Sequence, residues 1–260
     1  MAQRPRFEAS TVKTTRELVR SARDYFNRDL HGDEYRRITW NEGHVHSLID
    51  LLQPEAHQSV LDLGTGAGAV AFEIGRRFPG CQVVGIDVAE VAIARNIEKR
   101  GTDGISNVDF HSYSGTALPF EDASFDGVTC RYAFHHFPQP EVSVAEMSRV
   151  LRRDGRAIIS DPVPFDEDAG GFIDDFQRLK PDGHVRFYRR TELNEFFAGC
   201  GLHKAAEFRT QIAYPRTMDR RYEELLKRTP RVILEHYRVQ VRDAQVFITL
   251  DVGNTLFQKG

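Results

Sequence analysis

The sequence predicts an α/β fold with a doubly wound, mostly parallel β-sheet. From residue 58 onward, short apolar runs alternate with stretches in which apolar residues recur at helical spacing, as in right-handed βαβ units. The runs are apolar throughout, which is expected of strands that helices cover on both faces. A loop of alternating glycines directly follows the first run, at the edge where α/β sheets bind ligands.

Five apolar runs are expected to form the parallel strands, at residues 59–63, 82–86, 108–111, 127–130 and 157–160. The stretches between them show helical spacing, for example at Val70, Ile74 and Phe78. Two further runs, at residues 202–208 and 246–252, predict strands nearer the C-terminus. Before the first strand, residues 11–53 are expected to be mainly helical.

The composition is that of a soluble globular protein. Of the 260 residues, 40% are hydrophobic and 28% are charged, and the net charge of −3 argues against a protein that coats nucleic acid by charge. The three cysteines lie far apart, so neither a disulfide framework nor a zinc site is predicted. No apolar run is long enough to span a bilayer and no signal peptide is recognised, so a cytoplasmic location is expected.

The first strand–helix turn, VLDLGTGAG at residues 60–68, is the segment predicted to bind a ligand. Its glycines let the backbone turn tightly and let a ligand approach without a side chain in the way. The helix that opens after Gly68 presents free N–H groups and a partial positive charge. About 20 residues further on, Asp87 ends the second strand, where a carboxylate can accept hydrogen bonds from both hydroxyls of a ribose. The two features together predict a nucleoside-binding site.

Two alternatives stay open for this loop. Residues 64–69, GTGAGA, also satisfy the loose dinucleotide fingerprint, because alanine can stand in its last position. An NAD-dependent oxidoreductase is therefore a rival prediction. The other alternative is a glycine-rich turn that binds no ligand, although the acid at the expected distance weighs against it.

Three segments carry a resemblance to a known family: VLDLGTGAG at 60–68, GIDVAE at 85–90, and ALPFEDASFDGVTC at 117–130 followed by VLRRDGRAII at 150–159. In this order and spacing, the sequence resembles class I S-adenosylmethionine (SAM)-dependent methyltransferases, in particular the branch that includes the ubiquinone- and menaquinone-biosynthesis methyltransferases. The resemblance covers residues 40–160 well and continues weakly to the C-terminus. Dehydrogenases do not share the later segments, and Asp62 before the glycine loop also favours this family.

The resemblance implies a Rossmann-like fold with seven strands, the last of them antiparallel. Residues 1–55 would form N-terminal helices that cap the substrate site, with Tyr25, Tyr35 and Trp40 as candidates for its roof. Residues 56–260 would form the SAM-binding methyltransferase domain. Within that domain, residues 161–188 would be a substrate-side segment and residues 211–244 a helical insertion before the last strand.

The resemblance also implies a set of cofactor-binding residues: Asp62, Gly64, Thr65, Gly66, Gly68, Asp87, Val88, Ser114, Gly115 and Arg131. The glycine loop and its preceding acid would hold the methionine end of SAM, Asp87 the ribose and Val88 the adenine. Family members offer an acidic side chain to the adenine amino group where this chain has Ser114, although a hydroxyl can still accept that hydrogen bond. Arg131 would lie beside the reacting methyl group.

Four residues are candidates for catalysis: His135, His136, His184 and Arg186. The histidine pair follows the fourth predicted strand, and imidazole titrates near neutral pH, as a general base should. Arg186 could bind a carboxylate or polarise an oxyanion. Each candidate also has a plainer interpretation, as a histidine bonded to the backbone or an arginine on a solvated loop. No metal site is predicted, because adjacent histidines rarely chelate one ion.

The predicted function is methyl transfer from SAM to a small-molecule acceptor through an oxygen, nitrogen or carbon nucleophile. The alternatives are the NAD-dependent oxidoreductase, a SAM-binding enzyme of this fold with other chemistry such as cyclisation or decarboxylation, and a non-catalytic binding protein. The Asn/Asp-Pro-Pro-Tyr loop of methyltransferases that act on base amino groups does not follow the fourth strand. We therefore expect a small-molecule partner, no nucleic acid or membrane partner, and a monomer or homodimer.

Overall fold

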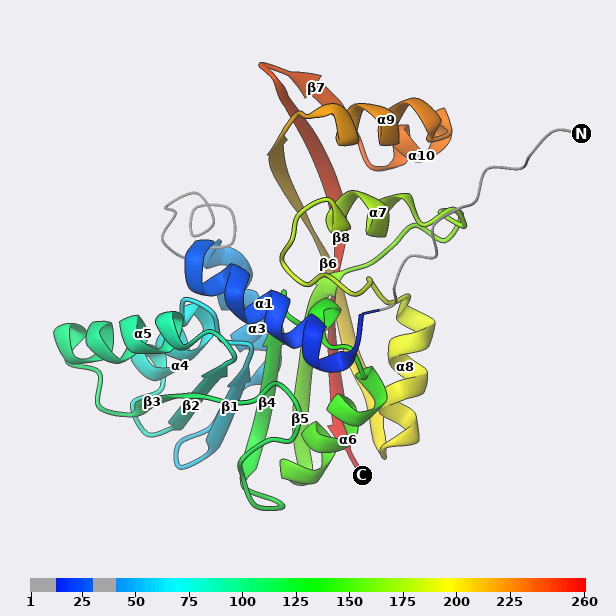
Figure 1. The fold of residues 1–260 in the computed structure, drawn as a ribbon. Coiled ribbons are helices and arrows are strands. Elements are labelled where there is room, and N and C mark those ends of the chain that lie inside the picture. Colours follow the sequence, from blue (N-terminus) through cyan, green and yellow to red (C-terminus); the bar gives the residue numbers. More distant parts are fainter. Residues whose placement is uncertain (1–12, 30–40) are drawn as a thin grey trace, which may run out of the picture.

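The computed structural model describes residues 13–29 and 41–260, which form an α/β fold around one sheet (Figure 1). Tyr35 and Trp40, two candidates for the substrate roof, lie outside the described residues. The strands are β1 (Ser59–Leu63), β2 (Gln82–Asp87), β3 (Val108–Ser112), β4 (Phe125–Arg131), β5 (Leu151–Pro162), β6 (Leu202–Thr217), β7 (Gln240–Arg242) and β8 (Gln245–Lys259).

The α-helices are α1 (Thr15–Asp29), α3 (Glu42–Leu52), α4 (Ala69–Arg77), α5 (Glu90–Asp103), α6 (Pro140–Val150), α7 (Phe172–Arg178), α8 (Arg190–Gly199), α9 (Arg220–Arg228) and α10 (Arg231–His236). A single 3-10 turn, η1 (Phe134–His136), follows β4. Within the described ranges, no helix combines the length and the apolar character needed to cross a membrane.

The sheet has the strand order β3-β2-β1-β4-β5-β8-β6, and β7 pairs with β8 off this path. Strands β1 to β5 pair in parallel, whereas β8 runs antiparallel to β5, β6 and β7. The seven expected strands are therefore present, with the last one antiparallel. The eighth, β7, was not predicted, because Ile233, Tyr237 and Val241 recur at helical spacing. Asp243 and Ala244 both adopt left-handed backbone angles (φ 50° and 55°) and turn the chain from β7 into β8.

Helices cover both faces of the sheet, which is why the strand sequences are apolar throughout. On one face, Leu61 of β1 belongs to a buried cluster with Met147 of α6 and Phe197 of α8. Its neighbour Val60 points the other way and belongs to a second cluster with Phe72 of α4. The same alternation repeats in β5, whose successive residues 157–159 fall into the two clusters in turn.

Strands β6 and β8 extend beyond the sheet as a long antiparallel pair (Figure 1). Residues 211–217, which the sequence assigned to a helical insertion, instead continue β6, and the helices begin only at α9. The strand persists because β8 buries every second residue along most of its length, so this pair needs a cover on one face only. Helices α7, α9 and α10 form that cover around Phe176, Tyr222, Ile233 and Tyr237.

Helix α1 is anchored to the first turn of α5 by polar contacts. Asn27 Nδ2 donates to Glu90 Oε2 at 2.9 Å, and the Val91 N–H donates to Asn27 Oδ1 at 3.0 Å. The helix also packs closely on Gly183, where an added Cβ would lie 2.7 Å from Ala22 N. These contacts hold α1 across the edge of the sheet at which the parallel strands end (Figure 1).

Candidate active site

The glycine loop is held from behind by a buried carboxylate. Asp62 Oδ2 accepts a hydrogen bond from Thr65 Oγ1 at 2.6 Å, and its Oδ1 accepts one from Thr129 Oγ1 of β4 at 2.8 Å. Burial raises the pKa of Asp62, and the two hydroxyl donors oppose that shift. Asp62 thus supports the glycine loop through these two hydrogen bonds.

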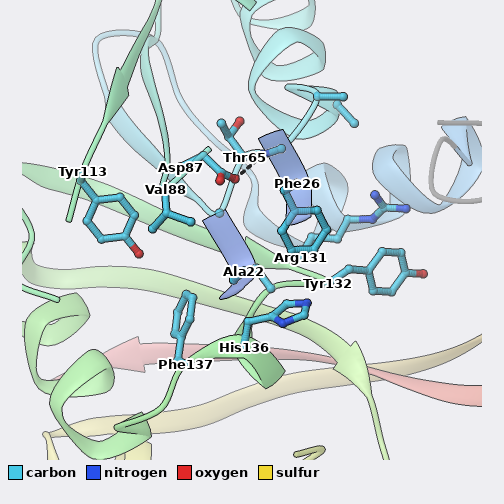
Figure 2. Close-up of a pocket in the computed structure, with 15 residues that line it drawn as sticks. Ala22, Phe26, Thr65, Asp87, Val88, Tyr113, Arg131, Tyr132, His136 and Phe137 are labelled. Carbon is cyan, nitrogen blue, oxygen red and sulfur yellow. Dashed lines mark hydrogen bonds between the residues drawn. The ribbon is translucent and has the colours of Figure 1, made fainter. Parts of the chain in front are cut away.

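Asp87 lies at the end of β2 with its carboxylate at the loop. Its Oδ2 accepts from the Gly66 N–H at 2.9 Å (Figure 2). Its Oδ1 accepts from the Ala89 N–H at 2.9 Å. Burial raises the pKa of Asp87, and these backbone donors partly offset the effect. Each carboxylate oxygen can still accept one further hydrogen bond, for example from a hydroxyl group.

A first cavity opens where the glycine loop, β2 and α1 meet. Its lining residues are Ala22, Phe26, Gly64, Thr65, Gly66, Ala67, Ala69, Asp87, Val88, Tyr113, Arg131, Tyr132, Ala133, His136 and Phe137. Figure 2 shows Asp87, Val88 and Tyr113 on one side of this space and Phe26, Tyr132 and His136 on the other. The sequence missed the aromatic residues and α1, because nothing in the glycine motif indicates which distant elements fold over it.

Four of the predicted cofactor residues do not line this cavity: Asp62, Gly68, Ser114 and Gly115. Gly68 is the N-cap of α4, with a φ of 78° that favours glycine. Gly115 serves the packing of α1, since an added Cβ would lie 2.7 Å from Val19 Cγ1. Ser114 is exposed, with its hydroxyl 3.0 Å from that of Thr116, and the neighbouring Tyr113 lines the cavity in its place.

A second cavity adjoins the first and shares Phe26, Tyr132 and His136 with it. Its other lining residues are His135, Pro162, Gln177, Lys180, Asp182, His184, Phe187, Ile212, Tyr214 and Arg216. Six of these residues belong to the segment 161–188 that was predicted to lie on the substrate side, and three more belong to the extended part of β6. Three of the four predicted catalytic residues, His135, His136 and His184, also line this space.

The two adjacent histidines differ in their partners. Asp161 orients His135, since its Oδ1 lies 2.8 Å from His135 Nδ1 and its Oδ2 accepts from the His135 N–H at 2.9 Å. His136 Nδ1 is buried and has no hydrogen-bond partner. Burial, and then the neighbouring His135, lowers the pKa of His136 well below its ordinary value, so the ring is neutral near pH 7.

The other two catalytic candidates are separated by the structure. His184 is buried with its Nε2 2.8 Å from Asp174 Oδ1, and burial lowers its pKa against the opposing effect of that carboxylate. Arg186 lines neither cavity. It pairs with Glu192 at 2.7 Å and stacks over Tyr188 at 4.3 Å, so its guanidinium supports the start of α8 and does not reach the site.

A buried network around His44 of α3 was not predicted. His44 Nε2 lies 2.7 Å from Asn254 Oδ1 of β8, which fixes Nε2 as the donor and leaves Nδ1 as an acceptor. Arg131 Nη2 and the Tyr132 hydroxyl lie 3.3 Å and 3.2 Å from this Nδ1. Because Arg131 and Tyr132 line the first cavity, His44 positions part of its wall. A lone histidine on an amphipathic helix gives no sequence signal of this kind.

Comparison with known proteins agrees with this geometry. A family profile described as "Methyltransferase domain" matches residues 61–159, which include the glycine loop, Asp87 and the histidine pair. Residues 61–159 of this chain are therefore similar to a methyltransferase domain, and curated relatives that match this region are named methyltransferases.

Two of the curated relatives are each 36% identical to this chain over the aligned residues. The methyltransferase YcgJ of Bacillus subtilis aligns over 160 residues, or 60% of this chain and 61% of the relative. The demethylmenaquinone methyltransferase of Thermus thermophilus aligns over 138 residues, or 51% of this chain and 61% of the relative. The chain thus spans about 61% of the length of each of these two relatives. The crystal structure of the YcgJ protein superposes with a TM-score of 0.74 over 84% of this chain and 99% of that chain at 23% identity, which shows a shared fold.

The contact between Gly64 and Ala133 leads to a prediction about stability. An added Cβ at Gly64 would lie 2.4 Å from Ala133 Cβ, whereas one at Gly66 would meet nothing within 4 Å. Both glycines have positive φ, at 70° and 51°, so both substitutions carry a similar backbone cost. We expect Gly64→Ala to lower the free energy of unfolding by about 1–3 kcal/mol more than Gly66→Ala, in urea titrations followed by circular dichroism. Equal losses in the two variants would contradict the close packing of the loop on η1.

The buried His44 leads to a prediction about pH. Burial lowers its pKa to about 4, with a further contribution from Arg131 and against the hydrogen bond with Asn254. In the unfolded chain His44 binds a proton near pH 6.5, whereas in the folded chain it does so only near pH 4. The free energy of unfolding therefore decreases as the pH falls from 6.5 toward 4. Between pH 7.5 and pH 5 the titration of His44 lowers the free energy of unfolding by about 2 kcal/mol. The His44→Gln variant should lose about 2 kcal/mol less than the wild type over that interval, and identical pH profiles would refute the assignment.

Proposed function

We propose that this protein transfers the methyl group of SAM to a small-molecule acceptor. One observation carries the proposal: the cavity at the glycine loop shares Phe26, Tyr132 and His136 with a second cavity. A methyl donor in the first and an acceptor in the second would meet at these shared residues, and direct transfer requires such an alignment. The similarity of residues 61–159 to a methyltransferase domain supports the assignment of donor and acceptor to the two cavities.

The wall of the first cavity suits SAM. Asp87 retains acceptor capacity for two ribose hydroxyls, and Val88 and Tyr113 offer apolar surface to the adenine. Bound SAM supplies a sulfonium that makes its methyl group electrophilic. We therefore assign Arg131 to the carboxylate of the methionine portion instead of the methyl end, because two positive charges repel each other.

His136 is the general base that these observations favour. His136 lines both cavities, its Nδ1 is buried without a partner, and burial keeps the ring neutral, so that one ring nitrogen has a free lone pair. His135 is the alternative, because Asp161 occupies its Nδ1 and leaves Nε2 as its free nitrogen. Either histidine would take the proton of a hydroxyl, an amine or an acidic carbon as the methyl group is transferred.

A small molecule is the acceptor class that this site favours. The second cavity is bounded by α1, by residues 182–187 and by β6, which suits a metabolite. The net charge of −3 provides little attraction for nucleic acid. The nature of the nucleophile, the monomeric or homodimeric state and the cytoplasmic location stay predictions.

Calorimetric titration with S-adenosylhomocysteine, and with NADH in parallel, tests the cofactor assignment. We expect S-adenosylhomocysteine to bind and NADH not to bind. In Asp87→Ala, affinity for S-adenosylhomocysteine should fall about 10- to 100-fold, because the ribose loses charge-assisted hydrogen bonds worth about 1.5–3 kcal/mol. Binding of NADH alone would instead favour hydride transfer.

The matched control for this experiment is Asp109→Ala, which removes an exposed acid from the neighbouring strand β3. It should bind S-adenosylhomocysteine as the wild type does. Unchanged affinity in Asp87→Ala, with circular dichroism showing both variants folded, would exclude Asp87 from the cofactor site.

The role of His136 as a base predicts a selective loss of turnover. In His136→Ala, transfer of radiolabelled methyl to an acceptor should slow about 100-fold or more, while affinity for S-adenosylhomocysteine changes little. His203→Ala, which removes an exposed histidine on β6, is the control and should retain full turnover. Full turnover in His136→Ala would exclude His136 as the general base, leaving either His135 in that role or a reaction that needs no base.

A further inference from the structure

Two polar atoms single out the second cavity. Among the described residues, the only buried side-chain nitrogen or oxygen atoms without a hydrogen-bond partner are His136 Nδ1 and Arg216 Nε. Both residues line the second cavity. Because buried polar groups in folded proteins almost always have a partner, two orphans in one cavity indicate that a ligand completes them.

Arg216 is held in place by neutral partners. Its guanidinium lies over the ring of Tyr214 at 4.4 Å, Nη1 donates to the Pro215 carbonyl at 3.1 Å, and Nη2 lies 3.4 Å from Gln177 Oε1. No carboxylate of the described chain lies within ion-pair distance of it. A partly buried guanidinium without a counter-charge is unfavourable in the free protein, and an anionic ligand would remove that penalty.

The other ionisable groups of the cavity do not supply this counter-charge. Asp182 pairs with Lys180 at 3.2 Å, so these two charges largely cancel. His184 and His136 are both held neutral by burial, which lowers the pKa of each. The positive charge of Arg216 is therefore the unbalanced charge of the lining.

Much of the remaining lining is apolar. Phe26, Phe187, Ile212 and Tyr214 line the cavity together with Arg216. An apolar or aromatic body fits such a wall, and a planar guanidinium fork pairs best with a carboxylate.

We propose that the methyl acceptor is a small apolar or aromatic acid whose carboxylate is bound by Arg216. This proposal rests on the proposed function, because it takes the second cavity as the acceptor site. The carboxylate lies at the β6 end of the cavity, and the nucleophilic atom at the other end faces His136. Arg216 thus selects the acceptor by charge and orients it along the cavity.

The test is calorimetric titration of the protein saturated with S-adenosylhomocysteine. The probes are three acids, salicylate, phenylacetate and hexanoate, each paired with its uncharged amide. At least one acid is expected to bind about 10-fold or more tightly than its amide. Arg216→Gln should abolish this preference. Arg209→Gln, which replaces an exposed arginine on the same strand, should retain it.

Binding of S-adenosylhomocysteine is measured first for the wild type and both variants. Its retention in Arg216→Gln shows that the variant is folded with an intact cofactor site, so a lost acid preference then reports on Arg216. Failure of the wild type to bind S-adenosylhomocysteine would overturn the proposed function itself. With that binding intact, the acceptor proposal is overturned if no acid binds, if acids and amides bind equally, or if Arg216→Gln keeps the preference.

Discussion

The buried carboxylate of Asp62 is the constraint on which the site depends. It joins the hydroxyl of Thr65 in the glycine loop to that of Thr129 in β4, and so fixes the ends of two neighbouring parallel strands relative to each other. Removing a carboxylate from water is unfavourable unless hydrogen bonds replace the lost hydration, so this arrangement tolerates little displacement. With both ends fixed, Gly64 packs directly on Ala133 at the start of the segment that carries the histidine pair.

The surrounding elements enclose two adjoining cavities at this edge of the sheet. Helix α1, tied to α5 through Asn27, brings Phe26 to the boundary between them. Tyr132 reaches the same boundary with a left-handed backbone (φ 55°), an uncommon conformation for a bulky residue, while its hydroxyl is held by His44. The extension of β6 past the sheet brings Arg216 to the lining of the second cavity. Donor and acceptor would then meet at side chains from two distant parts of the chain, Phe26 of α1 and residues 132–136.

The sequence predicts what local chemistry determines. The glycine loop and Asp87 form a contiguous strand–turn–helix unit, so their places at the cavity follow from spacing alone. Asp62 and Gly68 were assigned to the ligand. In the structure Asp62 is hydrogen-bonded within the loop, Gly68 caps α4, and neither lines the first cavity, a distinction that the motif alone does not make. Arg186 and Arg216 show why the sequence did not identify the charged residue of the second cavity. Both are arginines beside aromatic residues, and only the tertiary path of β6 brings one of them to the site.

The central claim is that the cofactor occupies the first cavity with its sulfur at the boundary with the second. A crystal structure of the protein with S-adenosylhomocysteine tests this claim most directly. We predict ribose hydroxyls on Asp87, the homocysteine portion along the glycine loop, and the sulfur facing Phe26, Tyr132 and His136. A ligand whose sulfur points away from that boundary, or one bound in the second cavity, would contradict the account.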